Sequence, residues 1–282
     1  MPHQQRTINP ERAKFFLELE EAVGEKALET LDPKSVKVSQ LQQQQPLVGS
    51  PTGPAKYTCS TQKPMPATFA GSARKGALQV GFGNIIHRWK TGPNKTVNFA
   101  TLANGYPKKE LALIAANALN EAAEEWNALE LGVQLKWVAD TKDAAFVLAY
   151  AGDQGGVLAE AFFPNTVDLN TLNVYKGALE AGTIRYLKNI FLHELGHVLG
   201  FRHEFAPELE DKKTDYSVQI GPRDPLSVMG YEFPPQIQQT DIMSAKAFYQ
   251  FPGTELGFKE SLVYHPGKDI RRLRIQDYDA DN

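Results

Sequence analysis

The segment HELGHVLGFRH at residues 193–203 constrains the fold of this chain more than any other part of its sequence. If the segment begins in a helix, His193 and His197 are four residues apart and share a face, about 6 Å apart along the axis. Gly200 is the residue type that tolerates the left-handed turn at a helix end, so the chain can double back there. The segment therefore predicts a helix that ends at Gly200 and a return that brings His203 to the other two imidazoles.

Three imidazole nitrogens that meet at one point predict a metal site, and zinc is the ion that best fits them. Zinc accepts neutral histidines at ~2.0 to 2.1 Å, and three protein ligands leave the fourth tetrahedral position for water, as in catalytic sites. Glu194 lies about 100° round the helix from His193, beside the ion, where it can act on that water. The ordinary alternative for a bare HExxH pattern is a pair of surface histidines with no ligand.

The extended pattern, together with SVMGY at residues 227–231, resembles the metzincin clan of zinc endopeptidases. Residues from about 78 to 251 resemble the clan's catalytic domain. The third histidine followed by Glu204, and a turn with Met-x-Tyr, resemble astacins. GGVLAEAFFP at residues 155–164 instead resembles the edge strand of matrix metalloproteases, which carry a histidine for a structural zinc where Glu160 stands. One catalytic zinc is therefore expected, and the family within the clan stays open.

The resemblance implies a zinc-dependent endopeptidase and a role for each residue of its site. His193, His197 and His203 would bind the zinc, and Glu194 would be general base toward a zinc-activated water and then general acid. Met229 would form an apolar floor below the metal. Tyr231 would stabilise the oxyanion, and its alternative is a packed aromatic residue. The alternative function is a zinc-binding interaction module that has lost proteolysis.

Polypeptides are the expected partners of the site. The resemblance implies that a substrate lies antiparallel along the edge strand, where main-chain hydrogen bonds hold it whatever its side chains. The residues expected to bind the substrate are Gly156, Val157, Leu158 and Ala159. The net charge of -3 gives no basis for binding nucleic acid or an anionic membrane. A monomer is expected.

The apolar periodicity predicts an α+β fold, and the resemblance makes it a metzincin-type zincin domain. Such a domain has a mixed twisted sheet, a backing helix, an active-site helix and a short lower subdomain. Helical spacing predicts helices over residues 9–31, 106–129, 183–200 and 238–251. Strands are predicted over residues 133–140 and 143–151, with an edge strand in 155–165. Residues 87–100 predict strand structure around Gly92 and Pro93, either as a turn or as a loop between two short strands.

The chain divides into three expected parts. Residues 1–76 combine the first helix with a segment rich in Gln, Pro and Gly, and they precede the metallopeptidase domain at 77–255 as a propeptide would. Cys59 is the only cysteine, and its thiolate could block the open metal position, although it lacks the flanking residues of a known cysteine switch. The alternative for Cys59 is a small apolar side chain. Residues 256–282 are expected to form a charged, solvated extension.

Composition excludes several classes of protein. A hydrophobic content of 42% and a charged content of 22% are ordinary for a globular chain, and one cysteine excludes an intramolecular disulfide. The first residues contain no apolar run of the kind a signal peptide needs, and no stretch approaches the ~20 apolar residues of a membrane span. A soluble protein is therefore expected, with its compartment open.

Overall fold

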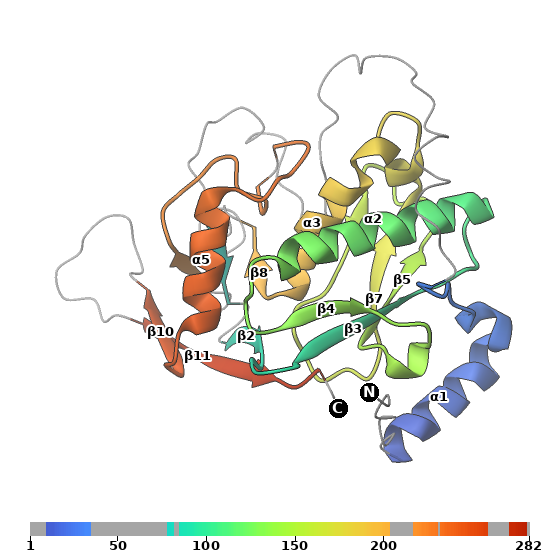
Figure 1. Cartoon of the computed structure of the whole chain (residues 1–282), viewed down its shortest axis with the longest axis horizontal. Helices are drawn as coiled ribbons and strands as arrows, with labels where there is room; N and C mark the ends of the chain where they lie inside the picture. Colours follow the sequence, from blue (N-terminus) through green and yellow to red (C-terminus); the bar gives the residue numbers. More distant parts are fainter. Residues whose placement is uncertain are drawn as a thin grey trace.

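The computed structural model describes residues 10–34, 78–81, 85–203, 217–230, 232–258 and 271–280. Within these ranges the chain forms four α-helices and three β-sheets. The largest sheet has five strands in the order β4-β3-β5-β7-β6, and the long helix α2 crosses it (Figure 1). The α+β class predicted from the sequence is confirmed. None of the helices in the described ranges is long and apolar enough to cross a membrane.

The five-stranded sheet is mixed, with a single antiparallel strand at one edge. Its strands are β3 (Thr96–Thr101), β4 (Gln134–Trp137), β5 (Phe146–Tyr150), β6 (Ala159–Glu160) and β7 (Asn170–Val174). All pairs are parallel except β6 with β7. In the centre, Phe99 pairs with Phe146, and their buried rings stack with centroids 5.5 Å apart. The strands predicted at 133–140 and 143–151 are confirmed as β4 and β5.

The edge strand predicted within residues 155–165 is confirmed at that edge, but it is short. Only Ala159 and Glu160 pair with β7 as a strand, although the main chain already meets β7 one residue earlier, where Leu158 O accepts a hydrogen bond from Tyr175 N at 3.0 Å. Before this point the chain turns at Gly155, which has a φ of 64° and donates its N–H to Asp153 Oδ1. The glycine loop therefore takes up the first half of the predicted strand.

Strand β7 was not predicted, because NTLNV alternates polar and apolar residues too weakly. In the structure it lies between β5 and β6, with Leu172 and Val174 fully buried. The asparagine that opens the strand is accommodated by another asparagine: Asn165 Nδ2 donates to Asn170 Oδ1 at 3.0 Å. The polar start of this internal strand is accommodated because the side-chain amides of Asn170 and the preceding Asn165 satisfy each other.

Helices α2 (Lys109–Asn127) and α3 (Leu187–Val198) pack against each other and confirm the helices predicted over 106–129 and 183–200. The buried face of α2 consists largely of alanine, which lets the two helices approach closely. Trp126 ends this face and donates its Nε1–H to Leu192 O of α3 at 2.9 Å. Helix α3 is buried on all sides from Ile190 to Val198, as expected of a helix in the middle of a domain.

The chain after Gly200 contributes α5 (Gln239–Gln250) and two strands of a three-stranded sheet, whose central strand comes from before the main sheet. The sheet order is β8-β1-β9, with β8 (Phe201–Arg202), β1 (Leu78–Val80) and β9 (Val218–Ile220), all antiparallel. The helix predicted over residues 238–251 is confirmed as α5. Strand β8 is short, and it leads directly from the end of α3 to His203.

The charged segment near the C-terminus is not a solvated extension, so this expectation for residues 256–282 is wrong over 271–278. Strand β11 (Arg271–Tyr278) lies between β10 (Glu255–Phe258) and β2 (Ile85–Trp89), antiparallel to the first and parallel to the second. Leu273 and Ile275 are buried, because they alternate with the arginines along the strand. Arg88 of β2 binds Asp277 through two hydrogen bonds of 2.7 and 3.2 Å.

Strands β2 and β3 belong to different sheets, so the connection at Gly92 and Pro93 is a loop between two short strands and not a hairpin turn. This outcome selects the second of the two alternatives for residues 87–100. The loop is closed by a hydrogen bond from Gly92 N to Gly132 O at 2.9 Å.

The N-terminal helix predicted over residues 9–31 is present, but it ends earlier. Helix α1 (Pro10–Val23) stops at Gly24, whose φ is 82°, and a 3-10 turn (Glu25–Leu28) follows. Arg12 is buried and donates to the carbonyl oxygens of Lys142, Ala144 and Asp168. The helix is thus attached to the ends of the strands of the main sheet. The Pro-rich and Gln-rich segment with Cys59 lies outside the described residues.

Candidate metal centre

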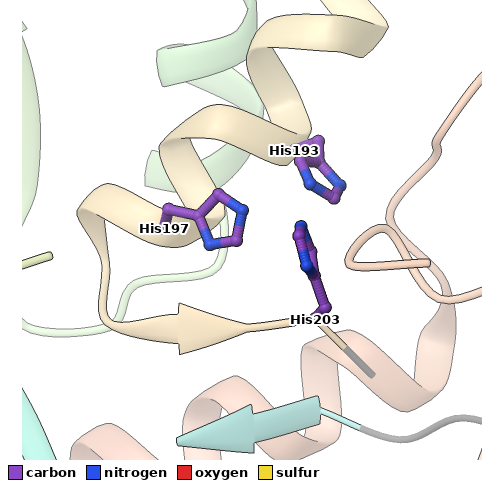
Figure 2. A group of neighbouring side chains, drawn as sticks. All are labelled: His193, His197 and His203. Atoms are coloured by element: carbon purple, nitrogen blue, oxygen red, sulfur yellow. The ribbon is translucent and has the colours of Figure 1, made fainter. Parts of the chain in front are cut away.

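Helix α3 and the turn after it bring three histidines to one point (Figure 2). His193 and His197 stand one turn apart on α3, and β8 returns His203 toward them. Gly200 makes this return with a φ of 92°, the left-handed conformation expected there. A Cβ atom at Gly200 would also lie 2.4 Å from His87 O, so a side chain is excluded by contact as well as by backbone conformation.

The three imidazoles form a buried group that can hold a metal ion. One ligand nitrogen from each ring lies within 4.8 Å of the others, and the ring centroids are 4.8 to 5.2 Å apart. Figure 2 shows the rings of His193 and His203 turned toward the ring of His197. All three side chains have a relative exposure of 0%. Within the described ranges this is the one group of three or more possible metal ligands.

Hydrogen bonds orient two of these rings. His193 Nδ1 lies 2.8 Å from Val228 O, and His197 Nδ1 lies 2.7 Å from Phe201 O. A carbonyl oxygen can only accept, so Nδ1 carries the proton in each ring and Nε2 keeps its lone pair. Burial lowers the pKa of both imidazoles well below the usual value, and the nearby His203 lowers it further. Neutral, oriented imidazoles are the form that binds a metal, so the donor set fits zinc.

Aromatic donors hold the end of α3, where the metal-binding segment turns. The last carbonyl groups of a helix have no partner within it. Trp89 Nε1 donates to Val198 O at 2.7 Å, and the Tyr249 hydroxyl donates to Leu199 O at 3.0 Å. Burial raises the pKa of Tyr249, so its hydroxyl remains protonated and able to donate. The end of the helix is therefore fixed by β2 on one side and by α5 on the other.

Met229 is fully buried and packs against α3. A Cβ atom on Gly196 would lie 2.2 Å from Met229 Sδ, so the methionine packs directly on the helix backbone between the two histidines. The sequence patterns did not single out Gly196. The signal was present, because a glycine inside a helical pattern without a cap usually has a packing reason.

Asp241 is a second residue that the sequence analysis missed. Its side chain lies on α5, 1% exposed, and accepts hydrogen bonds from Ser227 Oγ (2.7 Å), Val228 N (2.8 Å) and Gln238 N (2.9 Å). Burial raises the pKa of this carboxyl, against the opposing effect of these donors. Since Val228 O in turn accepts from His193, one carboxylate connects α5 through the methionine turn to a metal-site histidine.

Glu194 is fully buried on α3, next in sequence to His193. Its catalytic role remains a prediction. Tyr231 and Glu204 lie outside the described residues, so the structure does not place them. Of the four residues expected to bind substrate, Gly156 is exposed, Val157 is half-buried, and Leu158 and Ala159 are buried. Any role of Ala159 in substrate binding therefore falls to its main chain, whereas Leu158 O is already bonded to Tyr175 N.

Comparison with known proteins identifies the region that contains this centre. Residues 94–206 match the model of a peptidase family described as dual-action HEIGH metallo-peptidase. The match covers the five-stranded sheet, α2, α3 and all three histidines. No curated protein matches the chain.

Proposed function

We propose that the protein is a zinc-dependent endopeptidase, on the premise that residues 94–206, with all three histidines, match a metallopeptidase family of the metzincin type. The observation that carries the proposal is the convergence of three buried imidazoles. Glu194, the residue after His193, is buried on the same helix. Three protein ligands leave a coordination position for a reactant, whereas structural zinc sites have four.

His193, His197 and His203 would hold the zinc ion. When bound, zinc supplies a Lewis acid that activates water near neutral pH and polarises a peptide carbonyl. The hydrogen bonds to Val228 O and Phe201 O would keep two of the ligands in the correct tautomer without any rearrangement on metal binding. Met229 and Gly196 would fix the distance between the histidine helix and the turn below it.

Glu194 would carry the proton transfers. As a carboxylate it takes one proton from the attacking water as the new C–O bond forms. It then gives that proton to the amide nitrogen as the C–N bond breaks, so the products are a carboxylic acid and an amine and Glu194 is regenerated. Its complete burial strengthens its interaction with the charges of the reaction. Tyr231 is proposed to stabilise the negative oxygen of the transition state.

The substrate would be an extended polypeptide added to the edge of the main sheet at β6. Recognition through main-chain hydrogen bonds needs no chain terminus, so cleavage within a polypeptide is expected. Gly156, Val157, Leu158 and Ala159 lie at or just before this edge, and Gly156 offers main chain without a side chain in the way.

The test is hydrolysis of denatured casein or gelatin by the purified protein, with and without 1,10-phenanthroline. We expect cleavage that the chelator abolishes, and about one zinc per chain. A Glu194→Ala variant should keep its zinc and lose hydrolysis, while Glu121→Ala on the exposed face of α2 should keep both. Zinc binding without cleavage by the wild type would overturn the proposal and favour an interaction module.

A further inference from the structure

The free edge of β6 has main-chain groups placed to receive another strand. Within the described residues, β6 pairs with β7 and has no strand on its other side. Leu158 O accepts from Tyr175 N, whereas Val174 O, in the residue that pairs with Ala159, accepts from Ala151 N, just after β5 on the other side of β7. Because hydrogen-bonded and non-hydrogen-bonded pairs alternate in an antiparallel ladder, Ala159 N–H and C=O point away from β7. An added peptide would therefore bond to Ala159.

This edge borders the metal centre. Strand β6 contacts α3, the helix that carries His193 and His197. Just after the strand, Phe163 packs edge-on against the His197 ring with centroids 5.6 Å apart. A peptide on the edge therefore runs beside the histidines, and its residue opposite Glu160 lies within a few positions of the bond that would be cleaved.

Glu160 presents a carboxylate on one face of this edge. Ala159 is completely buried, and successive side chains point to opposite faces, so Glu160 projects away from the core that covers Ala159. The Tyr175 hydroxyl donates to Glu160 Oε2 at 2.7 Å and holds the carboxylate in place. Lys176, the next cation along the chain, is paired with Asp153 at 3.0 Å instead. In the described part of the chain Glu160 forms no ion pair, so its charge remains for a ligand.

We propose that Glu160 makes the site prefer substrates with lysine or arginine at the residue opposite it. This inference rests on the proposed endopeptidase function. A peptide residue bonded to Ala159 has its N-terminal neighbour opposite Glu160, in a pair without main-chain hydrogen bonds, where side chains approach most closely. At such positions a pair of opposite charges raises the equilibrium constant for pairing by up to about fivefold, and a pair of like charges lowers it by a similar factor.

The experiment measures kcat/KM on a peptide set with one cleavable core, in which each position in turn is Lys, Ala or Glu. We expect one position where Lys is preferred over Ala, and Ala over Glu, by up to about fivefold at each step at low salt. Glu160→Gln, which can still accept from Tyr175, should remove the preference, and Glu160→Lys should reverse it. Glu121→Gln changes the net charge equally on the exposed face of α2 and should leave the preference intact.

Binding of the same peptides to zinc-loaded Glu194→Ala protein, followed by fluorescence anisotropy, separates this inference from the proposed function. If the wild type cleaves nothing, but the Lys peptide binds better than the Glu peptide only when Glu160 is present, then the endopeptidase proposal fails and the Glu160 inference stands. If Glu160→Gln and Glu160→Lys retain the wild-type order of peptides in cleavage and in binding, Glu160 does not select the substrate.

Discussion

Asp241 shows how much of the metal centre depends on a residue that would not touch the metal. Its carboxylate fixes Ser227 and Val228, and Val228 O orients His193. In Asp241→Asn, an amide N–H₂ group replaces one of the two carboxylate oxygens. That group cannot accept a hydrogen bond, so it meets one of the donors that Asp241 binds. We expect zinc affinity to fall about 10- to 100-fold, the usual effect of losing a group that supports a ligand. Competition with a chromophoric chelator measures this.

Asp224→Asn is the matched control for that prediction. Asp224 accepts hydrogen bonds from Leu226 N and Thr240 Oγ1, in the same region, but it does not bond to Val228. Its zinc affinity should therefore stay within about threefold of wild type. Similar losses in the two variants would mean that the region is merely destabilised and that Asp241 has no specific connection to His193.

The contact between Gly196 and Met229 predicts a strongly non-additive pair of substitutions. Gly196→Ala places a methyl group against Met229 Sδ and should destabilise the metal-free protein by about 1–3 kcal/mol, as overpacking does. Met229→Ala removes the atoms in the way, so the double variant should be less destabilised than the sum of the two single variants. Urea unfolding of the four proteins gives the coupling energy, and simple additivity would contradict this packing.

At the scale of single residues, the sequence was sufficient to predict the three histidines, but it was insufficient to predict the residue that orients one of them. The spacing of His193, His197 and Gly200 dictates a local geometry that follows from one helix and one turn. Asp241 reaches the same place from α5, through contacts to Ser227 and Val228 that exist only after that helix has packed. Nothing in the local pattern around Asp241 distinguishes a buried acceptor from an ordinary acidic residue in the first turn of a helix.

Among the elements, α3 depends on donors from two other parts of the fold. In Trp89→Phe the ring is largely preserved, but Val198 O loses its donor at a fully buried position. An unsatisfied buried carbonyl costs about 1–3 kcal/mol, so we expect a loss of that size in the free energy of unfolding. Thermal denaturation measures it. Trp137→Phe, at a half-buried tryptophan that makes no such bond to α3, should cost less.

The elements also differ in how well their patterns predicted them. Helix α2 buries one regular face over 19 residues, so its periodicity was sufficient. Strand β7 begins with Asn170, whose side-chain amide bonds to that of Asn165, and its buried residues are Leu172 and Val174. Strand β11 carries arginines that suggest solvent, although its alternate residues Leu273 and Ile275 are the ones that pack. Both strands lie inside their sheets, β7 between β5 and β6 and β11 between β10 and β2, and the local pattern does not specify these partners.

For the molecule as a whole, β11 should contribute to stability as a core strand does. Leu273→Ala and Ile275→Ala should each lower the free energy of unfolding by about 2–5 kcal/mol, because both side chains are buried. Arg272→Ala and Arg274→Ala, which alternate with them on the exposed face, should change it by about 0.5 kcal/mol or less. Urea denaturation compares the four variants. Equal small effects would mean that the strand is peripheral in solution.

Metal binding should stabilise the whole domain, since the three histidines come together only in the folded chain. At zinc concentrations a thousandfold above Kd, the gain is about 4 kcal/mol, or roughly 8 to 16 °C in Tm for a domain of this size. Calorimetry with and without chelator measures the difference. The chelator should have a much smaller effect on His203→Ala. An unchanged Tm in wild type would be evidence against a metal at this centre.

The pairing of β2 with β11 affects the risk that the protein cleaves itself during refolding. Arg88 and Asp277 are 189 residues apart in the sequence. Contacts between residues so far apart form late in folding, after the local contacts of α3 and the turn that follows it. The metal site of one molecule would then be assembled while parts of other molecules were still unfolded. Those unfolded parts are extended polypeptide, the proposed substrate. Supplying zinc only after refolding is complete would therefore protect the preparation from autolysis.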